Sequence, residues 1–178
     1  MVHPYQTNLR NGPIVLAFGG NALLPDPQQS AQQDERAAEF AQALSYYLPH
    51  PKGIVLVHGN GPQVGNILLR AEATKLFLPY APLDRLVAET QGSIGYILSR
   101  ALYNALQNRG EGTEIATILT QVVVDENDPK MKTPSKPVGP FYNKVEADRL
   151  IHHQGWDMVE IPKKGWRRVV PSPQPKEI

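Results

Sequence analysis

The chain has 178 residues, 41% of them apolar and 20% charged, which suits a folded α/β domain and argues against a disordered chain. Its 18 basic and 17 acidic residues leave a net charge of +1, which gives no electrostatic case for nucleic acid or an anionic membrane as a partner. The lack of cysteine excludes disulfides, thiolate zinc sites and a cysteine nucleophile. With no signal-peptide core and no apolar run near the ~18 residues of a membrane span, we expect a cytoplasmic protein.

The first half of the chain alternates apolar runs with helical spacing. Residues 13–18 and 53–58 are continuous apolar runs, typical of strands buried on both faces of a parallel sheet. Between them, Ser30 and Gln33 form a capping-box pattern at the start of a helix that Pro49 ends.

Two further helices and a strand follow. Pro62 suits the first turn of a helix, and a longer helix follows over residues 82–109. Gly92 and Gly95 inside the longer helix indicate close backbone packing or a break. The apolar run 115–124 predicts a third buried strand, so the chain is expected to form a mainly parallel α/β sheet.

The last third changes character. Residues 125–142 are rich in proline and lysine without periodicity, which is typical of a lid or a protruding flap. A short helix over 145–153 and a hairpin of strands 156–161 and 166–170 are expected next. Residues 171–178 have the composition of a linker.

Two glycine-rich turns follow the first two strands: Gly19-Gly20-Asn21 and Gly59-Asn60-Gly61. Ligands bind beyond the carboxyl ends of strands in an open parallel sheet, and glycine lets backbone N–H groups approach an anion. The following helix N-terminus adds partial positive charge, and asparagine adds an amide donor. Each turn alone is more often a plain tight turn, but the pair together predicts an anion site.

Other sites find less support. The P-loop and the Rossmann fingerprint both fail on spacing, since Asn66 stands where a P-loop lysine would and Pro62 lies between glycines that are one residue too far apart. His58 is a candidate anion contact, although a structural histidine is the commoner case. Adjacent His152 and His153 point about 100° apart on a helix, so no metal site is predicted.

Basic residues gather in two short stretches, one around Lys136 and one that includes Arg167 and Arg168. Each stretch is either a solvated surface or a landing site for a small anion. We therefore keep Arg167 and Arg168 with His58 as candidate anion contacts.

Six motifs, spread over residues 13–178, resemble carbamate kinases of the amino-acid kinase superfamily in order and spacing. They are Ala17-Phe-Gly-Gly-Asn-Ala-Leu23, His58-Gly-Asn-Gly-Pro-Gln-Val-Gly-Asn66, Gln91-Gly-Ser-Ile-Gly-Tyr96, Thr120-Gln-Val-Val-Val-Asp125, Lys136-Pro-Val-Gly-Pro-Phe141 and Gly165-Trp-Arg-Arg-Val-Val-Pro-Ser-Pro173. The resemblance implies a three-layer αβα sandwich with a mainly parallel sheet, and residues 126–165 as a protruding lid subdomain.

The resemblance also implies a reaction and roles for residues. Carbamate kinases transfer a phosphoryl group between ATP and carbamate, using ATP or ADP with Mg²⁺, in arginine and carbamoyl phosphate breakdown. Gly19, Gly20, Asn21, Gly59, Asn60 and Gly61 would bind carbamate or carbamoyl phosphate. Since Ala17 stands where many superfamily members carry a lysine, Lys136 would be the catalytic cation. Superfamily dimers imply a homodimer through helix 82–109.

The resemblance also leaves alternatives open. The nucleotide-binding half of the family has no counterpart in residues 13–178, so we expect a carbamate-binding half whose partner is a separate or continuing nucleotide-binding half. One alternative is a truncated, non-catalytic module that binds carbamoyl phosphate or serves only for dimerisation. Another is a different amino-acid kinase, which the residues at 17 and 136–140 argue against.

Overall fold

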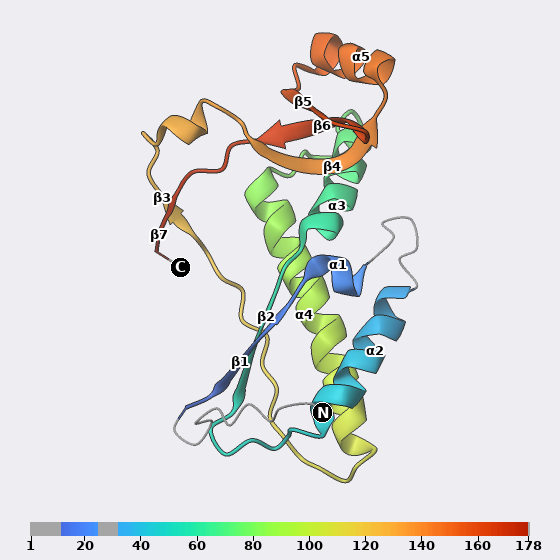
Figure 1. Ribbon diagram of the computed structural model, residues 1–178, viewed down its shortest axis with the longest axis vertical. Coiled ribbons are helices and arrows are strands. Elements are labelled where there is room, and N and C mark those ends of the chain that lie inside the picture. The colour runs from blue at the N-terminus through green and yellow to red at the C-terminus, as the bar shows by residue number, and fades with distance from the viewer. Residues whose placement is uncertain (1–11, 25–31, 178) are drawn as a thin grey trace. The chain divides into compact units, whose positions relative to one another are not determined.

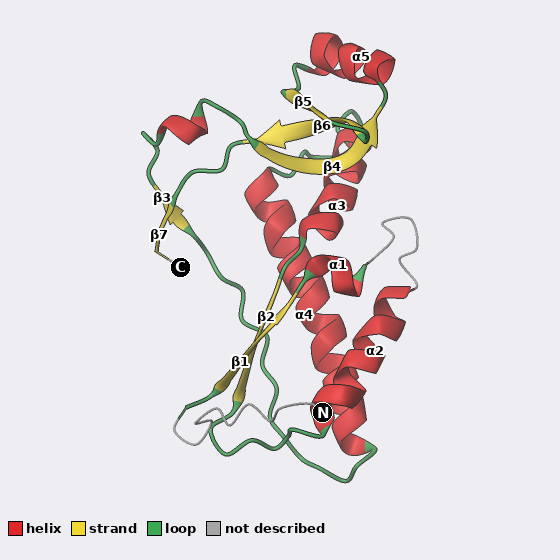
Figure 2. Ribbon diagram, viewed as in Figure 1, coloured by secondary structure: helices red, strands yellow, loops and turns green. Residues whose placement is uncertain are grey.

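The computed structural model describes residues 12–24 and 32–177, and these form two compact units. Unit 1 takes in the described residues up to Gly59 together with Ile94–Thr117. Unit 2 takes in Asn60–Ser93 and the described residues from Ile118 onward. Figures 1 and 2 show the elements of each unit, and helix α4 (Leu83–Gln107) contributes to both.

Unit 1 is built on a pair of parallel strands, β1 (Ile14–Phe18) and β2 (Ile54–His58), which are in register from Ile14 opposite Ile54 to Phe18 opposite His58. Helix α1 (Gly20–Leu23) follows β1 directly, and α2 (Gln32–Ser45) precedes β2. The core joins these elements to the second part of α4 through Leu23, Ala37, Ile94 and Leu98.

The two strands are covered on one face only. Their residues alternate between half-buried and exposed, and the half-buried set packs against α2 and α4. Val15, Val55 and Val57 on the other face are exposed. The prediction of strands buried on both faces is therefore wrong for the described residues, because their helices reach one face of the pair.

Unit 2 combines α3 (Gly61–Thr74) and the first part of α4 with a three-stranded antiparallel sheet of order β4-β6-β5. The bounds of its other elements are β3 (Val123–Val124), the 3₁₀ helix η1 (Pro129–Met131), β4 (Lys136–Tyr142), α5 (Lys144–Gln154), β5 (Met158–Ile161), β6 (Gly165–Val170) and β7 (Pro175–Glu177). We call β4, β5 and β6 the lid sheet, since most of it lies within residues 126–165.

Local signals explain several elements of unit 2. Pro62 stands in the first turn of α3, as predicted. Helix α5 begins with a complete capping box between Asn143 and Glu146 and ends at Gly155, whose φ of 65° is the left-handed conformation that favours glycine. The predicted hairpin is confirmed as β5 and β6, paired with Ile161 opposite Gly165.

Two predictions about the last third of the chain are wrong. The run 115–124 is not a buried strand, because only Val123–Val124 is a strand and Ile118 is 80% exposed. An apolar run becomes a strand only where a neighbouring strand accepts its backbone hydrogen bonds, and residues 115–122 pair with no strand of the described residues. Residues 175–177 are not a linker either, since β7 pairs antiparallel with β3.

Two glycines and one cap were singled out in the sequence. Helix α4 runs unbroken through Gly92 and Gly95, so neither glycine marks a break. Gly95 is closely packed, because a Cβ atom there would meet the Thr117 side chain, whereas a Cβ atom on Gly92 would meet nothing within 4 Å. The prediction of close packing therefore holds at Gly95 and is wrong at Gly92. The Ser30 cap lies outside the described residues. Helix α2 ends at Ser45, before Pro49.

The predicted α/β class is confirmed, with a parallel strand pair and helices in unit 1 and an antiparallel sheet beside helices in unit 2. In residues 12–24 and 32–177, no helix is both long and apolar enough to cross a lipid bilayer.

Candidate functional site

The first glycine turn lies at the carboxyl end of β1, in unit 1. Gly20 is buried and Gly59, after β2, approaches it closely: a Cβ atom on Gly59 would lie 3.2 Å from the Gly20 nitrogen. The Gly59 N–H donates to the Phe18 carbonyl at 3.0 Å, which fixes that approach. The ends of the two parallel strands therefore meet with backbone against backbone, and Asn21 continues the first turn into α1.

The second glycine turn continues into unit 2 and begins a long helix. Asn60 occupies the N-cap position of α3, and Gly61 is the first helical residue. The Asn60 side-chain amide donates to Thr90 Oγ1 at 2.9 Å, and Thr90 Oγ1 donates to the Val87 carbonyl at 2.7 Å. Because the helix N-terminus carries partial positive charge and N–H donors, this turn is suited to an anion.

Thr90 is a residue that sequence reasoning missed. It is buried within α4 and holds the Asn60 side chain, 30 residues away in the chain. The sequence did contain a signal for this role, because Thr90 is a polar residue on an otherwise apolar helical face and a buried hydroxyl requires a hydrogen-bond partner. Thr90 therefore helps to orient the second turn.

His58 is the last residue of β2 and is half-buried. Its Nδ1 lies 3.4 Å from the Gly59 carbonyl oxygen, a contact to the neighbouring residue. The histidine thus stands at the entrance of the second turn, and its contact to an anion stays a prediction.

Lys136 is the first residue of β4 and lies opposite Val170 of β6. Its side chain is exposed, while Val138, two residues along the strand, is buried. Lys136 belongs to unit 2, as do Asn60 and Gly61, whereas Gly19, Gly20 and His58 belong to unit 1.

The two candidate arginines of β6 are held by other residues of unit 2. Arg167 donates from Nε to the Gly139 carbonyl at 2.7 Å and lies over the Phe141 ring. Arg168 pairs with Glu72 at 3.0 Å and lies over the Trp156 ring. Both contacts favour a structural role, so the role of these arginines in anion binding stays a prediction.

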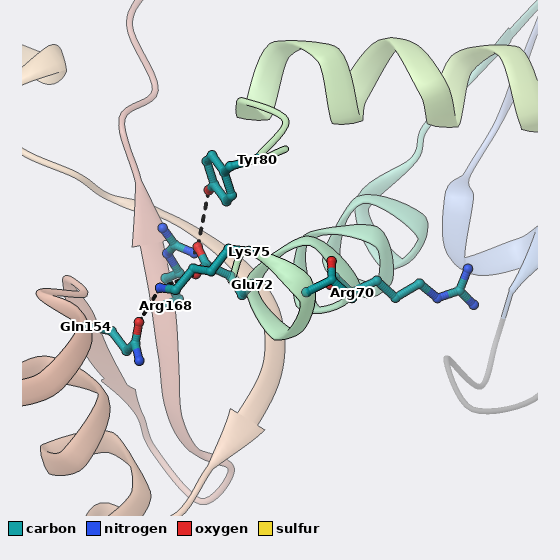
Figure 3. Close-up of polar contacts among 7 residues, drawn as sticks. Arg70, Glu72, Lys75, Tyr80, Gln154 and Arg168 are labelled. Carbon is teal, nitrogen blue, oxygen red and sulfur yellow. Dashed lines mark hydrogen bonds and ion pairs between the residues drawn. The ribbon is translucent and has the colours of Figure 1, made fainter. Parts of the chain in front are cut away.

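Glu72 is the centre of a polar cluster drawn in Figure 3. Its carboxylate accepts from Lys75 and Arg168 at 3.0 Å each and from the Tyr80 hydroxyl at 3.2 Å, while Lys75 also reaches Gln154 of α5. Burial would raise the pKa of Glu72, but the hydrogen bonds and charges of Lys75 and Arg168 outweigh it and hold the pKa below its ordinary value. Burial beside this carboxylate raises the pKa of Tyr80.

Sequence motifs far apart in the chain meet in unit 2. Gln91 of α4 exchanges hydrogen bonds with the backbone of Thr120, at 2.8 and 3.2 Å. Gly65 of α3 lies so close to Gly139 of β4 that a Cβ atom on Gly65 would be 3.0 Å from the Gly139 Cα. Each contact joins two of the quoted motifs: the first joins those that begin at Gln91 and Thr120, and the second joins the His58 motif to the Lys136 motif.

Within residues 12–24 and 32–177, no group of three or more His, Asp or Glu side chains is placed to hold a metal ion. The candidate residues instead offer the backbone N–H groups of the glycine turns and the cation of Lys136, which are groups that bind anions. We therefore derive no step through a metal from these residues.

The fold and the turns define a class: an α/β protein whose paired parallel strands end in glycine turns, the arrangement at which such proteins bind anionic ligands. Carbamate kinase of Thermococcus kodakarensis is 45% identical over 168 residues, which cover 92% of this chain and 53% of the relative. The structure of carbamate kinase from Giardia lamblia bound to citric acid matches with a TM-score of 0.83 at 37% identity, over 94% of this chain and 55% of that one.

The same Giardia lamblia enzyme bound to AMP-PNP matches with a TM-score of 0.76 at 36% identity, over 94% of this chain and 54% of that one. No protein-family model matches the chain. The chain is thus homologous to carbamate kinases and corresponds to an N-terminal half, because it spans about half the length of the relatives it matches.

Proposed function

We propose that the chain supplies the carbamate-binding half of a carbamate kinase-type phosphotransferase. In this reaction ATP and carbamate give ADP and carbamoyl phosphate, and the reverse direction serves arginine and carbamoyl phosphate breakdown. The cytoplasm is the compartment that we propose. The homology at 45% identity supports the reaction class.

The observation that carries the proposal is the close approach of Gly59 to Gly20 at the ends of β1 and β2. A Cβ atom on Gly59 would lie 3.2 Å from the Gly20 nitrogen, so glycine at position 59 lets the backbones of the two strand ends lie this close together. Asn60 and Gly61 continue directly from Gly59 into the N-terminus of α3. The glycines and asparagines of both turns would hold the carbamoyl group and the transferred phosphoryl group.

Phosphoryl transfer depends chiefly on positioning and on neutralising the charge that develops on the phosphoryl oxygens. Lys136 is the cation that we propose for this task. Its exposed position at the start of β4 leaves the ammonium accessible to a ligand. We propose His58 as a further anion contact, and we assign Arg167 and Arg168 to anion binding only as secondary candidates, because both guanidinium groups have protein partners.

ATP or ADP with Mg²⁺ would supply the second phosphate-bearing partner. We propose that this partner binds in the part of the relatives that the chain does not match, either in a continuing chain or in a separate polypeptide. The exposed apolar face of Val15, Val55 and Val57 supports this proposal, since an uncovered apolar face favours a protein partner.

A homodimer through residues 82–109 is the assembly that we propose. Tyr96 and Tyr103 lie two turns apart on α4, so they share one face, and they are 61% and 55% exposed. Tyrosine is enriched in protein interfaces. Analytical ultracentrifugation of the Tyr96→Ser, Tyr103→Ser double variant should show a shift toward monomer, and an unchanged dimer would place the interface elsewhere.

The experiment that tests the carbamate-binding role is a titration of the ¹⁵N-labelled chain with carbamoyl phosphate. The amide signals of Gly20, Asn21, Asn60 and Gly61 should shift together along one binding curve. Shifts confined to one turn would contradict a shared site. Inorganic phosphate is the control for simple anion binding, and equal affinity for both would remove the carbamoyl specificity.

Two alternatives are decided by adding a nucleotide-binding half. If the chain is a non-catalytic module for binding or dimerisation, the mixture will bind carbamoyl phosphate without forming ATP from ADP. If it is a different amino-acid kinase, acetyl- or aspartyl-type acceptors will replace carbamate. ATP formation from carbamoyl phosphate supports the proposed reaction.

A further inference from the structure

Helix α4 carries a buried stripe of residues four positions apart, and one polar residue interrupts it. The stripe is apolar at Leu86, Ile94 and Leu98, whereas the position between the first two is Thr90, which is 4% exposed. A threonine at a buried position needs hydrogen-bond partners for its hydroxyl, because burial removes it from water. The partners that Thr90 takes therefore indicate why a polar residue stands there.

The hydrogen bonds of Thr90 fix which end of the Asn60 side chain faces helix α4. The Thr90 hydroxyl lies 2.7 Å from the Val87 carbonyl oxygen, which can only accept, so the hydroxyl hydrogen is used in that bond. Toward Asn60, at 2.9 Å, the Thr90 oxygen can then only accept. The group of Asn60 that faces Thr90 must be the amide nitrogen, because an amide oxygen there would set two acceptors against each other.

Asn60 does not cap helix α3 with its side chain, although it stands at the N-cap position. Asparagine is preferred at this position because its side-chain oxygen accepts from an N–H group of the first helical turn. Here the side chain of the N-cap residue makes no such hydrogen bond, and Pro62 in the first turn has no N–H to offer. The bond to Thr90 thus takes the place of the usual cap, and it holds the carboxamide in a direction that the helix alone would not set.

The amide oxygen of Asn60 is an acceptor among candidate groups that are mostly donors. It accepts neither from Thr90 nor from the start of α3, and Asn60 is only half-buried. The backbone N–H groups of the turns and the ammonium group of Lys136 donate, which suits the phosphoryl group of carbamoyl phosphate. The amino group of the same ligand also donates, so it needs an acceptor, and the Asn60 oxygen has that chemistry.

We propose that Thr90 is a positioning residue and that Asn60 determines specificity: Thr90 holds the amide nitrogen of Asn60, so that the amide oxygen accepts from the amino group of a carbamoyl ligand. This inference rests on the proposed function, because it concerns the same site. Acetyl phosphate carries a methyl group in place of the amino group and has no hydrogen to donate there. The pair of residues therefore favours carbamoyl phosphate over acetyl phosphate.

The direction of the Asn60 side chain is measured first, in the ¹⁵N-labelled chain without ligand. One of its two side-chain N–H signals should depend only weakly on temperature, because that hydrogen donates to Thr90. Thr90→Val keeps the shape of the side chain and removes the hydroxyl, so both signals should then depend strongly on temperature. Thr90→Ser should keep one weakly dependent signal. Two strongly dependent signals in the unchanged chain would overturn the proposal.

Titrations with carbamoyl phosphate, acetyl phosphate and inorganic phosphate then measure the specificity. The unchanged chain should bind carbamoyl phosphate about tenfold more tightly than acetyl phosphate, the factor that one ordinary hydrogen bond contributes. Thr90→Val should reduce this ratio to about twofold or less and leave the affinity for inorganic phosphate within about twofold, since the N–H donors remain. Thr90→Ser should restore the ratio. A variant that is merely damaged would lose affinity for all three anions, and an unchanged ratio in Thr90→Val would refute the positioning role.

Thr74→Val is the matched control. The Thr74 hydroxyl also donates to a carbonyl of its own helix, that of Arg70 at 2.9 Å, but Thr74 lies at the opposite end of α3 from Asn60. This variant should leave all three affinities within about twofold.

The same measurements separate this inference from the proposed function. If the unchanged chain binds none of the three anions, the proposed function fails, while the Asn60 signals still decide whether Thr90 holds that side chain. If carbamoyl phosphate and acetyl phosphate bind equally well and more tightly than inorganic phosphate, the site of the proposed function stands and the specificity assigned to Asn60 is wrong.

Discussion

Replacing Gly65 by alanine tests the packing of the lid sheet on α3. The added Cβ would lie 3.0 Å from the Gly139 Cα and 3.1 Å from the Gly139 nitrogen, closer than nearly all such contacts. Both atoms are backbone, so neither can rotate away. The sheet must therefore move from the helix by a few tenths of an ångström.

Two effects of opposite sign determine how much Gly65→Ala changes the free energy of unfolding. Overpacking of this kind costs about 1–3 kcal/mol, while alanine in a helix interior is about 0.5–1 kcal/mol more favourable than glycine. We expect Gly65→Ala to lower the free energy of unfolding by about 1 kcal/mol, as the difference between these two terms.

Gly92→Ala is the matched control. Gly92 is also inside a helix and in the same unit, but a Cβ atom there meets nothing within 4 Å. This variant should gain about 0.5–1 kcal/mol from helix propensity alone. The two variants should thus differ by about 2 kcal/mol, although the chemical change is the same.

Urea unfolding followed by tryptophan fluorescence measures this difference, since both tryptophans, Trp156 and Trp166, lie in unit 2. The midpoint should fall for Gly65→Ala and rise for Gly92→Ala, with similar slopes. If Gly65→Ala is stabilised as much as Gly92→Ala, the lid sheet does not rest on α3 as described, and the reasoning from close backbone approach fails.

Three further predictions concern catalysis and pH. In the chain assembled with a nucleotide-binding half, Lys136→Ala should lower turnover at least about 10²-fold, since loss of one preorganised donor costs roughly 2.7–4 kcal/mol. The control Lys163→Ala, in the exposed turn between β5 and β6, should lower turnover much less. Equal losses in the two variants would remove the special role of Lys136. The isolated chain should form no ATP from carbamoyl phosphate and ADP above background in a luciferase assay, because both phosphate-bearing partners must be held in line. The lowered pKa of Glu72 means that its pairing stabilises the fold above the ordinary value of 4.5 and that this stability is lost as the pH falls through the lowered value. Urea midpoints of Glu72→Gln should therefore lose less between pH 6 and pH 3 than those of the unchanged chain, and parallel curves would contradict the pairing.

Several elements were predictable from sequence because their signals are local. Pro62 at the start of α3, the apolar spacing of α4 and the turn between β5 and β6 each depend on residues within a few positions of one another. The glycine turns were predictable for the same reason, since each directly follows an apolar run. The class of the fold followed from the alternation of these elements.

Burial and pairing could not be predicted in this way. The run 115–124 has the composition of a buried strand, yet Ile118 is exposed, because burial depends on which elements pack over the run and not on its composition. Likewise, both faces of β1 and β2 are apolar in sequence, but the helices of unit 1 cover one face.

The sequence by itself determined the α/β class and the positions of the two glycine turns, and its resemblance to carbamate kinases gave Lys136 as the candidate cation. Only the tertiary structure decided which partners the charged residues take. Arg168 is one of several basic residues near the hairpin in sequence, and Glu72 is one acidic residue on a helix, 96 positions away. Their pairing depends on how the lid sheet packs on α3, and such packing arises from the shapes and apolar surfaces of whole elements, which no short pattern of residues contains.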